Sequence, residues 1–239
     1  MIPMRAIRST LAAYGRGLVG LLYPEQCAGC DAALLSGERI ICTECRSRLP
    51  QTRSHVTPVE AIERRFWGRV PLRSVDAFFY FRKEGRVQHL MHQYKYKGRR
   101  EIGTELGRWY GDVLREGKAA TGDVMVPVPL HPTRERTRGY NQSEVFGRAV
   151  SEALSVPLLT DVLLRTQNRS SQTRRGRLER WQNAEATYEV RNAAAIEGRH
   201  VVLIDDIITT GATLEACAQV LLERGKPASI SVLCIAATE

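Results

Sequence analysis

Two adjacent aspartates, Asp205 and Asp206, stand between an apolar run at residues 201–204 and a turn rich in small and hydroxyl side chains. The turn consists of Thr209, Thr210, Gly211, Ala212 and Thr213. Backbone N–H groups at a helix start, with a glycine that lets a ligand come close, form a cradle for an anion. The threonine hydroxyls would add further donors. The segment therefore predicts a phosphate site that needs no lysine.

The two carboxylates would repel a phosphate, but they accept hydrogen bonds well from the vicinal hydroxyls of a sugar. A ribose 5-phosphate satisfies both halves, with its phosphate in the turn and its 2′- and 3′-OH on Asp205 and Asp206. The segment lacks the patterns of a P-loop and of a dinucleotide fold. A buried strand and a capped helix would explain the apolar run and Thr213, but not two acids at the carboxyl end of a strand, where open α/β sheets bind ligands.

Four cysteines form two C-x2-C pairs, Cys27 with Cys30 and Cys42 with Cys45, separated by the eleven residues 31–41. Each pair offers two thiolates from one tight turn, and two turns complete the four-sulfur shell that Zn²⁺ favours. A module of this size has too small an apolar core to fold alone. The bound metal would therefore supply its stability. Unrelated buried thiols, a redox pair and an iron–sulfur site are the alternatives to structural zinc.

The remaining cysteines, Cys217 and Cys234, lack partners at ligand spacing and are expected in the apolar core. The 239 residues carry a net charge of +9, which favours a polyanionic partner or a phosphorylated ligand. No uncharged stretch is long enough to span a membrane, and Arg16 interrupts the N-terminal apolar residues before they reach signal-peptide length. These features predict a cytoplasmic protein with reduced thiols and no stable membrane insertion.

Four segments are expected along the chain. Residues 1–23 place apolar side chains on one face of a helix, which would pack on the protein or lie on a membrane surface. Residues 24–50 form the cysteine module, and 51–73 a polar connector with one short helix. Residues 74–239 alternate strand and helix, which predicts an α/β domain with a mostly parallel sheet flanked by helices. Strands are expected at 75–81, 124–129, 188–190, 201–204 and 230–236, and helices from 87, at 102–114, at 142–154 and at 213–224.

Residues 201–214 resemble the 5-phosphoribosyl-1-pyrophosphate (PRPP) signature of type I phosphoribosyltransferases. Further motifs narrow the resemblance to the ComF (competence protein F-like, GntX-like) family, and it covers about residues 22–237. These motifs are the C-x2-C pairs, Lys95-Tyr-Lys97-Gly98, Val126-Pro-Val-Pro129, Arg138-Gly-Tyr-Asn141-Gln142, and Gln172 with Arg180-x-x-Asn183.

The resemblance implies a type I phosphoribosyltransferase-like fold with a zinc-ribbon-like N-terminal module. It implies that PRPP is bound with Mg²⁺ and that Asp205 and Asp206 are catalytic as well as ribose-binding. It also places the pyrophosphate of PRPP near a loop at 130–141, in which His131 is expected as a loop residue, and near a flexible loop at 165–183. The residues implied to contact pyrophosphate or to close over it are Lys95, Lys97, Arg138, Asn141, Gln142, Gln172, Arg180 and Asn183.

A second reading comes from another functional class. The ComF family is associated with DNA uptake and acts with a DNA-translocating helicase. A basic zinc module and arginine-rich loops would bind single-stranded DNA electrostatically. The protein would then be a non-catalytic DNA-handling factor on a phosphoribosyltransferase scaffold. Nothing in the sequence before Asp123 identifies a purine, a pyrimidine or an amine as the acceptor of a phosphoribosyl group.

Overall fold

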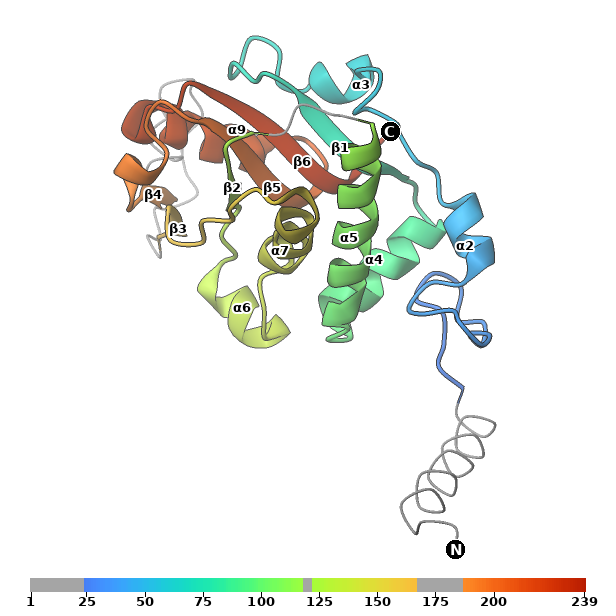
Figure 1. The fold of residues 1–239 in the computed structure, drawn as a ribbon. Helices are drawn as coiled ribbons and strands as arrows, with labels where there is room; N and C mark the ends of the chain where they lie inside the picture. Colours follow the sequence, from blue (N-terminus) through green and yellow to red (C-terminus); the bar gives the residue numbers. More distant parts are fainter. Residues whose placement is uncertain (1–23, 118–121, 167–186) are drawn as a thin grey trace, which may run out of the picture. The chain divides into compact units, whose positions relative to one another are not determined.

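The computed structural model describes residues 24–117, 122–166 and 187–239 (Figure 1). The expected N-terminal helix at 1–23 and the loop residues Gln172, Arg180 and Asn183 lie outside them. The chain divides into two compact units, Met1–Leu49 and Pro50–Glu239. Among the described residues, no helix combines the length and the apolar character needed to cross a bilayer.

A four-stranded parallel sheet lies at the centre of the second unit, with the strand order β1-β6-β5-β2 (Figure 1). Its strands are β1 (Val75–Phe81), β2 (Val124–Pro127), β5 (His200–Ile208) and β6 (Ser229–Thr238). The central strands β5 and β6 begin in apolar runs that are buried on both faces, as parallel sheets require. The expectation of a mostly parallel α/β sheet is confirmed.

The strand expected at 201–204 is longer than the sequence indicates. β5 continues through the two aspartates to Ile208, because β6 pairs with it along this stretch, Asp205 opposite Cys234 and Ile208 opposite Ala237. Strands β3 (Leu163–Arg165) and β4 (Tyr188–Val190) form a separate antiparallel pair. Of these two strands, β3 was not among the expected ones.

The main helices lie close to their expected positions. They are α4 (Arg86–Tyr96), α5 (Arg100–Glu116), α7 (Gln142–Leu154) and α9 (Ala212–Val220), and a π-helical turn (Leu221–Gly225) continues α9. Helix α7 packs against α5, β2 and β5, whereas α9 packs against β4 and β5. Cys217 on α9 and Cys234 on β6 are fully buried, which confirms their expected place in the core.

The expectation of a loop at 130–141 is wrong, because α6 (Pro132–Arg138) lies within it. Pro132 occupies the first helical position, where its missing N–H costs nothing. The ring Nδ1 of His131 accepts a hydrogen bond from the Thr133 N–H at 3.2 Å and caps the helix. His131 is therefore a capping residue, and the turn after β2 carries a short helix rather than an open loop.

Residues 51–73 contain one short helix, α3 (Glu60–Glu63). Ile62, Phe66 and Val70 from this segment are buried in the same apolar core as the strands of the parallel sheet. The segment thus belongs to the Pro50–Glu239 unit and packs beside the end of β5.

Candidate functional site

The phosphate loop, residues Thr209–Thr213, joins β5 to α9. Its shape requires Gly211, which has a φ of +81° and whose Cβ, if present, would lie 2.9 Å from the Phe66 ring. Within the described chain, the backbone N–H groups of Thr210 and Gly211 donate no hydrogen bond. The other four residues of the loop are exposed. Free N–H groups at the start of a helix can donate hydrogen bonds to a bound anion.

Arg65 holds the start of this loop, and no motif in the sequence marks it. Its Nη1 donates to the carbonyl oxygens of Ile208 at 3.1 Å and Thr209 at 2.7 Å, and its Nη2 donates to the carbonyl of Thr238. The C=O and N–H of a trans peptide point in opposite directions. Fixing the Thr209 carbonyl on Arg65 therefore turns the Thr210 N–H away from Arg65, where it is free to meet a ligand.

We expect Arg65→Met to weaken binding of ribose 5-phosphate by about tenfold, because the loop loses charge-assisted hydrogen bonds that fix its peptides. Calorimetric titration measures the affinity. Arg65→Lys should restore part of it, and Arg64→Met, at an exposed neighbouring position, should leave it unchanged. Equal affinities of wild type and Arg65→Met would show that the loop holds its shape without this side chain.

Asp205 and Asp206 lie on β5 just beyond the last residue of β2, which pairs with Ile204. Asp205 Oδ1 accepts a hydrogen bond from Ser143 Oγ at 2.9 Å, at the start of α7, and one from the Asp206 N–H at 2.8 Å. Asp206 Oδ2 forms an ion pair with Lys95 Nζ at 2.8 Å. Both side chains of that pair are largely buried, 18% exposed for Lys95 and 16% for Asp206. Lys95, expected at a phosphate, thus contacts a carboxylate of the site.

Burial, together with the negative charge of Asp206, raises the pKa of Asp205 to about 7. An unfolded aspartate loses its proton near pH 4, so between these values the folded protein binds more protons than the unfolded chain. The free energy of unfolding should therefore fall as pH rises from about 4 to 7. Urea unfolding across this range should show a smaller fall for Asp205→Asn, and an identical fall would contradict the assigned pKa.

The residues expected at the pyrophosphate divide into two groups. Asn141 caps α7, its Oδ1 accepting from the Ser143 N–H at 3.0 Å, and its Nδ2 donates to the Val128 carbonyl at 3.0 Å. Gln142 is buried and accepts a hydrogen bond from Arg138 Nη1 at 2.9 Å. These two amides hold the turn between α6 and α7, whereas Lys95, Lys97 and Arg138 line one cavity between the end of α4 and α6.

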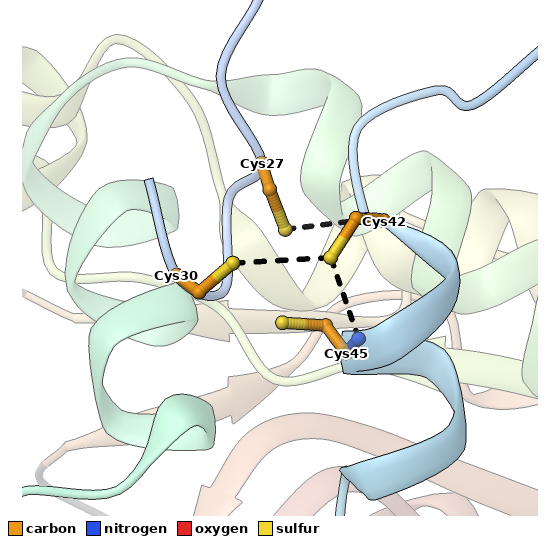
Figure 2. A group of neighbouring side chains, drawn as sticks. All are labelled: Cys27, Cys30, Cys42 and Cys45. Atoms are coloured by element: carbon orange, nitrogen blue, oxygen red, sulfur yellow. Dashed lines mark hydrogen bonds between the residues drawn. The ribbon is translucent and has the colours of Figure 1, made fainter. Parts of the chain in front are cut away.

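The four cysteines gather in the Met1–Leu49 unit, with all four Sγ atoms within 4.8 Å of one another (Figure 2). Cys30 Sγ and Cys42 Sγ are 3.8 Å apart. Four sulfurs at about 2.3 Å from a tetrahedral Zn²⁺ would stand about 3.8 Å from one another. All four are free cysteines in the structure. The cluster is compatible with a structural zinc ion.

The backbone around the cluster suits thiolates. The N–H groups of Gly29 and Cys42 donate to Cys27 Sγ at 3.3 and 3.2 Å, and the N–H of Cys45 donates to Cys42 Sγ at the start of α2 (Thr43–Arg48). Burial raises the pKa of Cys27, but hydrogen bonds from the N–H groups of Cys42 and Gly29 and from the neighbouring cysteine side chains bring it down to about 7. A Cβ on Gly29 would lie 3.0 Å from Cys45 Sγ, so the first turn needs glycine to close on the second.

The chain is similar to a known domain and to two named bacterial proteins. A model of the phosphoribosyl transferase domain matches residues 141–239. The chain is 27% identical to the competence protein ComFC of Bacillus subtilis over 83% of its length and 84% of the relative. It is 29% identical to the DNA utilization protein YhgH of Escherichia coli strain K12 over 89% of its length and 90% of the relative. These relatives and the cysteine cluster confirm the resemblance to the ComF family.

A solved structure of glutamine PRPP amidotransferase from B. subtilis is also similar, with a TM-score of 0.44 and 20% identity. That match covers 60% of this chain and 30% of the amidotransferase chain.

Proposed function

We propose that this ComF-like protein binds PRPP at the carboxyl end of β5 and transfers its phosphoribosyl group. The observation that carries the proposal is the placement of two partly buried carboxylates directly before a phosphate loop with free N–H groups. Such a pair of neighbouring subsites matches the two ends of a ribose 5-phosphate. The matching domain model, over residues 141–239, includes Asp205, Asp206 and the phosphate loop.

In the proposed complex the 5′-phosphate lies in the phosphate loop, held by the N–H groups of Thr210 and Gly211 and by the threonine hydroxyls. The N-terminal end of α9 adds a favourable dipole. The ribose hydroxyls donate to Asp205 and Asp206. Ser143 orients Asp205, because its hydroxyl donates to one oxygen of that carboxylate and leaves the other for the ligand.

Transfer forms a bond from the acceptor's lone pair to C1 of the ribose and breaks the C1–O bond, whose electron pair leaves with pyrophosphate. The acceptor's proton passes to a carboxylate of the site or to water. Asp205 and Asp206 would stabilise the positive charge that develops on the ribose ring. We propose that Lys95, Lys97 and Arg138 offset the charge of the pyrophosphate, and we retain Asn141, Gln142, Gln172, Arg180 and Asn183 as further proposed contributors.

Mg²⁺ is proposed as the ion that accompanies PRPP, because carboxylate and phosphate oxygens are its preferred ligands. It would neutralise charge on the pyrophosphate. Asp205 and Asp206 supply suitable oxygens, and Asp206 Oδ2 would have to exchange the Lys95 ammonium for a new partner. Structural Zn²⁺ in the four-cysteine cluster and a cytoplasmic location complete the proposal.

Release of pyrophosphate tests the reaction. Protein, PRPP and Mg²⁺ are incubated with a panel of bases and amines, and pyrophosphate is measured with a coupled assay. Release with any acceptor, lost in the Asp205→Ala/Asp206→Ala variant, supports a transferase. If the protein binds PRPP but releases no pyrophosphate with any acceptor of the panel, it is a PRPP-binding protein, and transfer to those acceptors is contradicted.

Single-stranded DNA is the second proposed ligand. The names of two relatives, a competence protein and a DNA utilization protein, favour it. The net charge of +9 would support binding to phosphates, with a steep dependence on salt. If the protein handles DNA in this way, we propose a DNA-translocating helicase as its partner. Tight DNA binding that does not depend on PRPP or on Asp205 and Asp206, with no pyrophosphate release, would favour a DNA-handling factor over an enzyme.

A further inference from the structure

Lys95 stands between the two halves of the proposed PRPP site. It is the penultimate residue of α4, and its Nζ forms an ion pair with Asp206 Oδ2 at 2.8 Å. The same side chain lines the cavity of about 560 Å³ between the end of α4 and α6, whose cations are proposed for pyrophosphate. One ammonium group therefore adjoins the ribose subsite on one side and the pyrophosphate subsite on the other.

Burial makes this ion pair matter for binding. The side chains of Lys95 and Asp206 are only 18% and 16% exposed, so water solvates neither charge fully. An ion that loses its partner in such surroundings is costly, because little solvation replaces the lost attraction. A ligand that draws on Asp206 but offers Lys95 no anion thus weakens the pair without replacing it. Ribose 5-phosphate is such a ligand, because its phosphate would lie in the phosphate loop.

The cavity itself offers Lys95 no other anion. Among the described residues its lining contains no acidic side chain, but two threonine hydroxyls and the basic residues Lys95, Lys97, Arg134 and Arg138. Arg138 is held in place by a hydrogen bond to Gln142. A pyrophosphate bound among these cations would give Lys95 a second anion. The flexible stem and three N–H donors of a lysine allow it to turn from a carboxylate towards such a group.

We propose that Lys95 is an exchangeable counter-ion that selects PRPP over ribose 5-phosphate. The inference rests on the proposed function. Without ligand, Lys95 neutralises Asp206. When pyrophosphate enters the cavity, the ammonium turns towards it and leaves Asp206 a full negative charge with which to accept a ribose hydroxyl. Each half of PRPP therefore strengthens the binding of the other half, whereas ribose 5-phosphate has to compete with Lys95 for the carboxylate.

Calorimetry with two separate ligands measures this coupling. The sugar probe is 1-deoxyribose 5-phosphate, which lacks the hydroxyl on C1 and so leaves room for pyrophosphate. It is titrated into the protein with and without saturating pyrophosphate, at one Mg²⁺ concentration. Pyrophosphate should tighten its binding to the wild type by about tenfold, a coupling of ordinary size, although two anions alone would repel each other. Lys95→Met should abolish this gain and bind the sugar phosphate alone at least as tightly as the wild type does.

Two further variants make the result specific to the ion pair. Lys97→Met removes a cation of the same cavity that, within the described part of the chain, forms no ion pair. It should weaken pyrophosphate binding but keep the tenfold coupling. Asp206→Asn breaks the ion pair from the other side, while its amide oxygen still accepts a hydroxyl. It should lose the coupling as well, so the test does not depend on whether Lys95→Met folds.

Other results overturn the inference. If pyrophosphate leaves the affinity for the sugar phosphate unchanged, or lowers it, in a wild type that binds PRPP, then Lys95 is not exchanged between the two groups. If the tenfold gain persists in Lys95→Met or in Asp206→Asn, the coupling comes from Mg²⁺ or from another side chain. Failure of the wild type to bind PRPP at all contradicts the proposed function as well, and this outcome is distinct from PRPP binding without coupling.

Discussion

Replacing Asp205 and Asp206 by alanine together should weaken PRPP binding by at least about 100-fold. Each carboxylate is expected to accept a hydrogen bond from one ribose hydroxyl, and a hydrogen bond to a charged group contributes about 1.5–3 kcal/mol. Loss of two such bonds gives about 3–6 kcal/mol, which corresponds to about 100-fold or more in the dissociation constant. Titration calorimetry with PRPP and Mg²⁺ measures the change.

Two controls separate this effect from a folding defect. Asp112→Ala removes an exposed aspartate on α5 that, among the residues that the structure describes, forms a side-chain pair only with Arg115. This variant should bind PRPP as the wild type does. Thermal unfolding should show that the double variant still folds cooperatively, because neither side chain belongs to the apolar core cluster. Equal PRPP affinity in wild type and double variant would eliminate this site assignment.

Removal of one ligand from the cysteine cluster should have the second large effect. Protein purified without added metal should contain about one zinc per chain, and Cys42→Ser should lose it. Because zinc binding supplies the folding free energy of such modules, about 10–16 kcal/mol in small zinc-finger peptides, the Met1–Leu49 unit should unfold with the loss of metal. Elemental analysis and protease sensitivity at residues 24–49 are the measurements.

Cys217→Ala is the matched control, since Cys217 is also buried but lies on α9, outside the cluster. It should keep the zinc even if it lowers the stability of the Pro50–Glu239 unit. Iron with visible absorbance in the wild type would replace the zinc assignment by an iron–sulfur site. A folded Met1–Leu49 unit with four free thiols and no metal would refute any structural metal there.

Local patterns in the sequence determined much of this protein. The spacing of Cys27, Cys30, Cys42 and Cys45 predicted their gathering, because each C-x2-C pair closes within one turn of chain. The position of α7 was predicted, since its apolar periodicity lies within a short stretch. The apolar strands and the phosphate loop were likewise visible, as each depends on neighbours a few residues away.

The tertiary structure alone decided which distant side chains meet at the site. Lys95 contacts Asp206, and Ser143 contacts Asp205. Arg65 contacts the carbonyls of Ile208 and Thr209 across 143 and 144 positions of sequence. Such contacts depend on how separate elements pack, and no local propensity encodes them. The same reason extends β5 to Ile208, because pairing with β6, rather than apolar character, keeps the strand extended through its two aspartates.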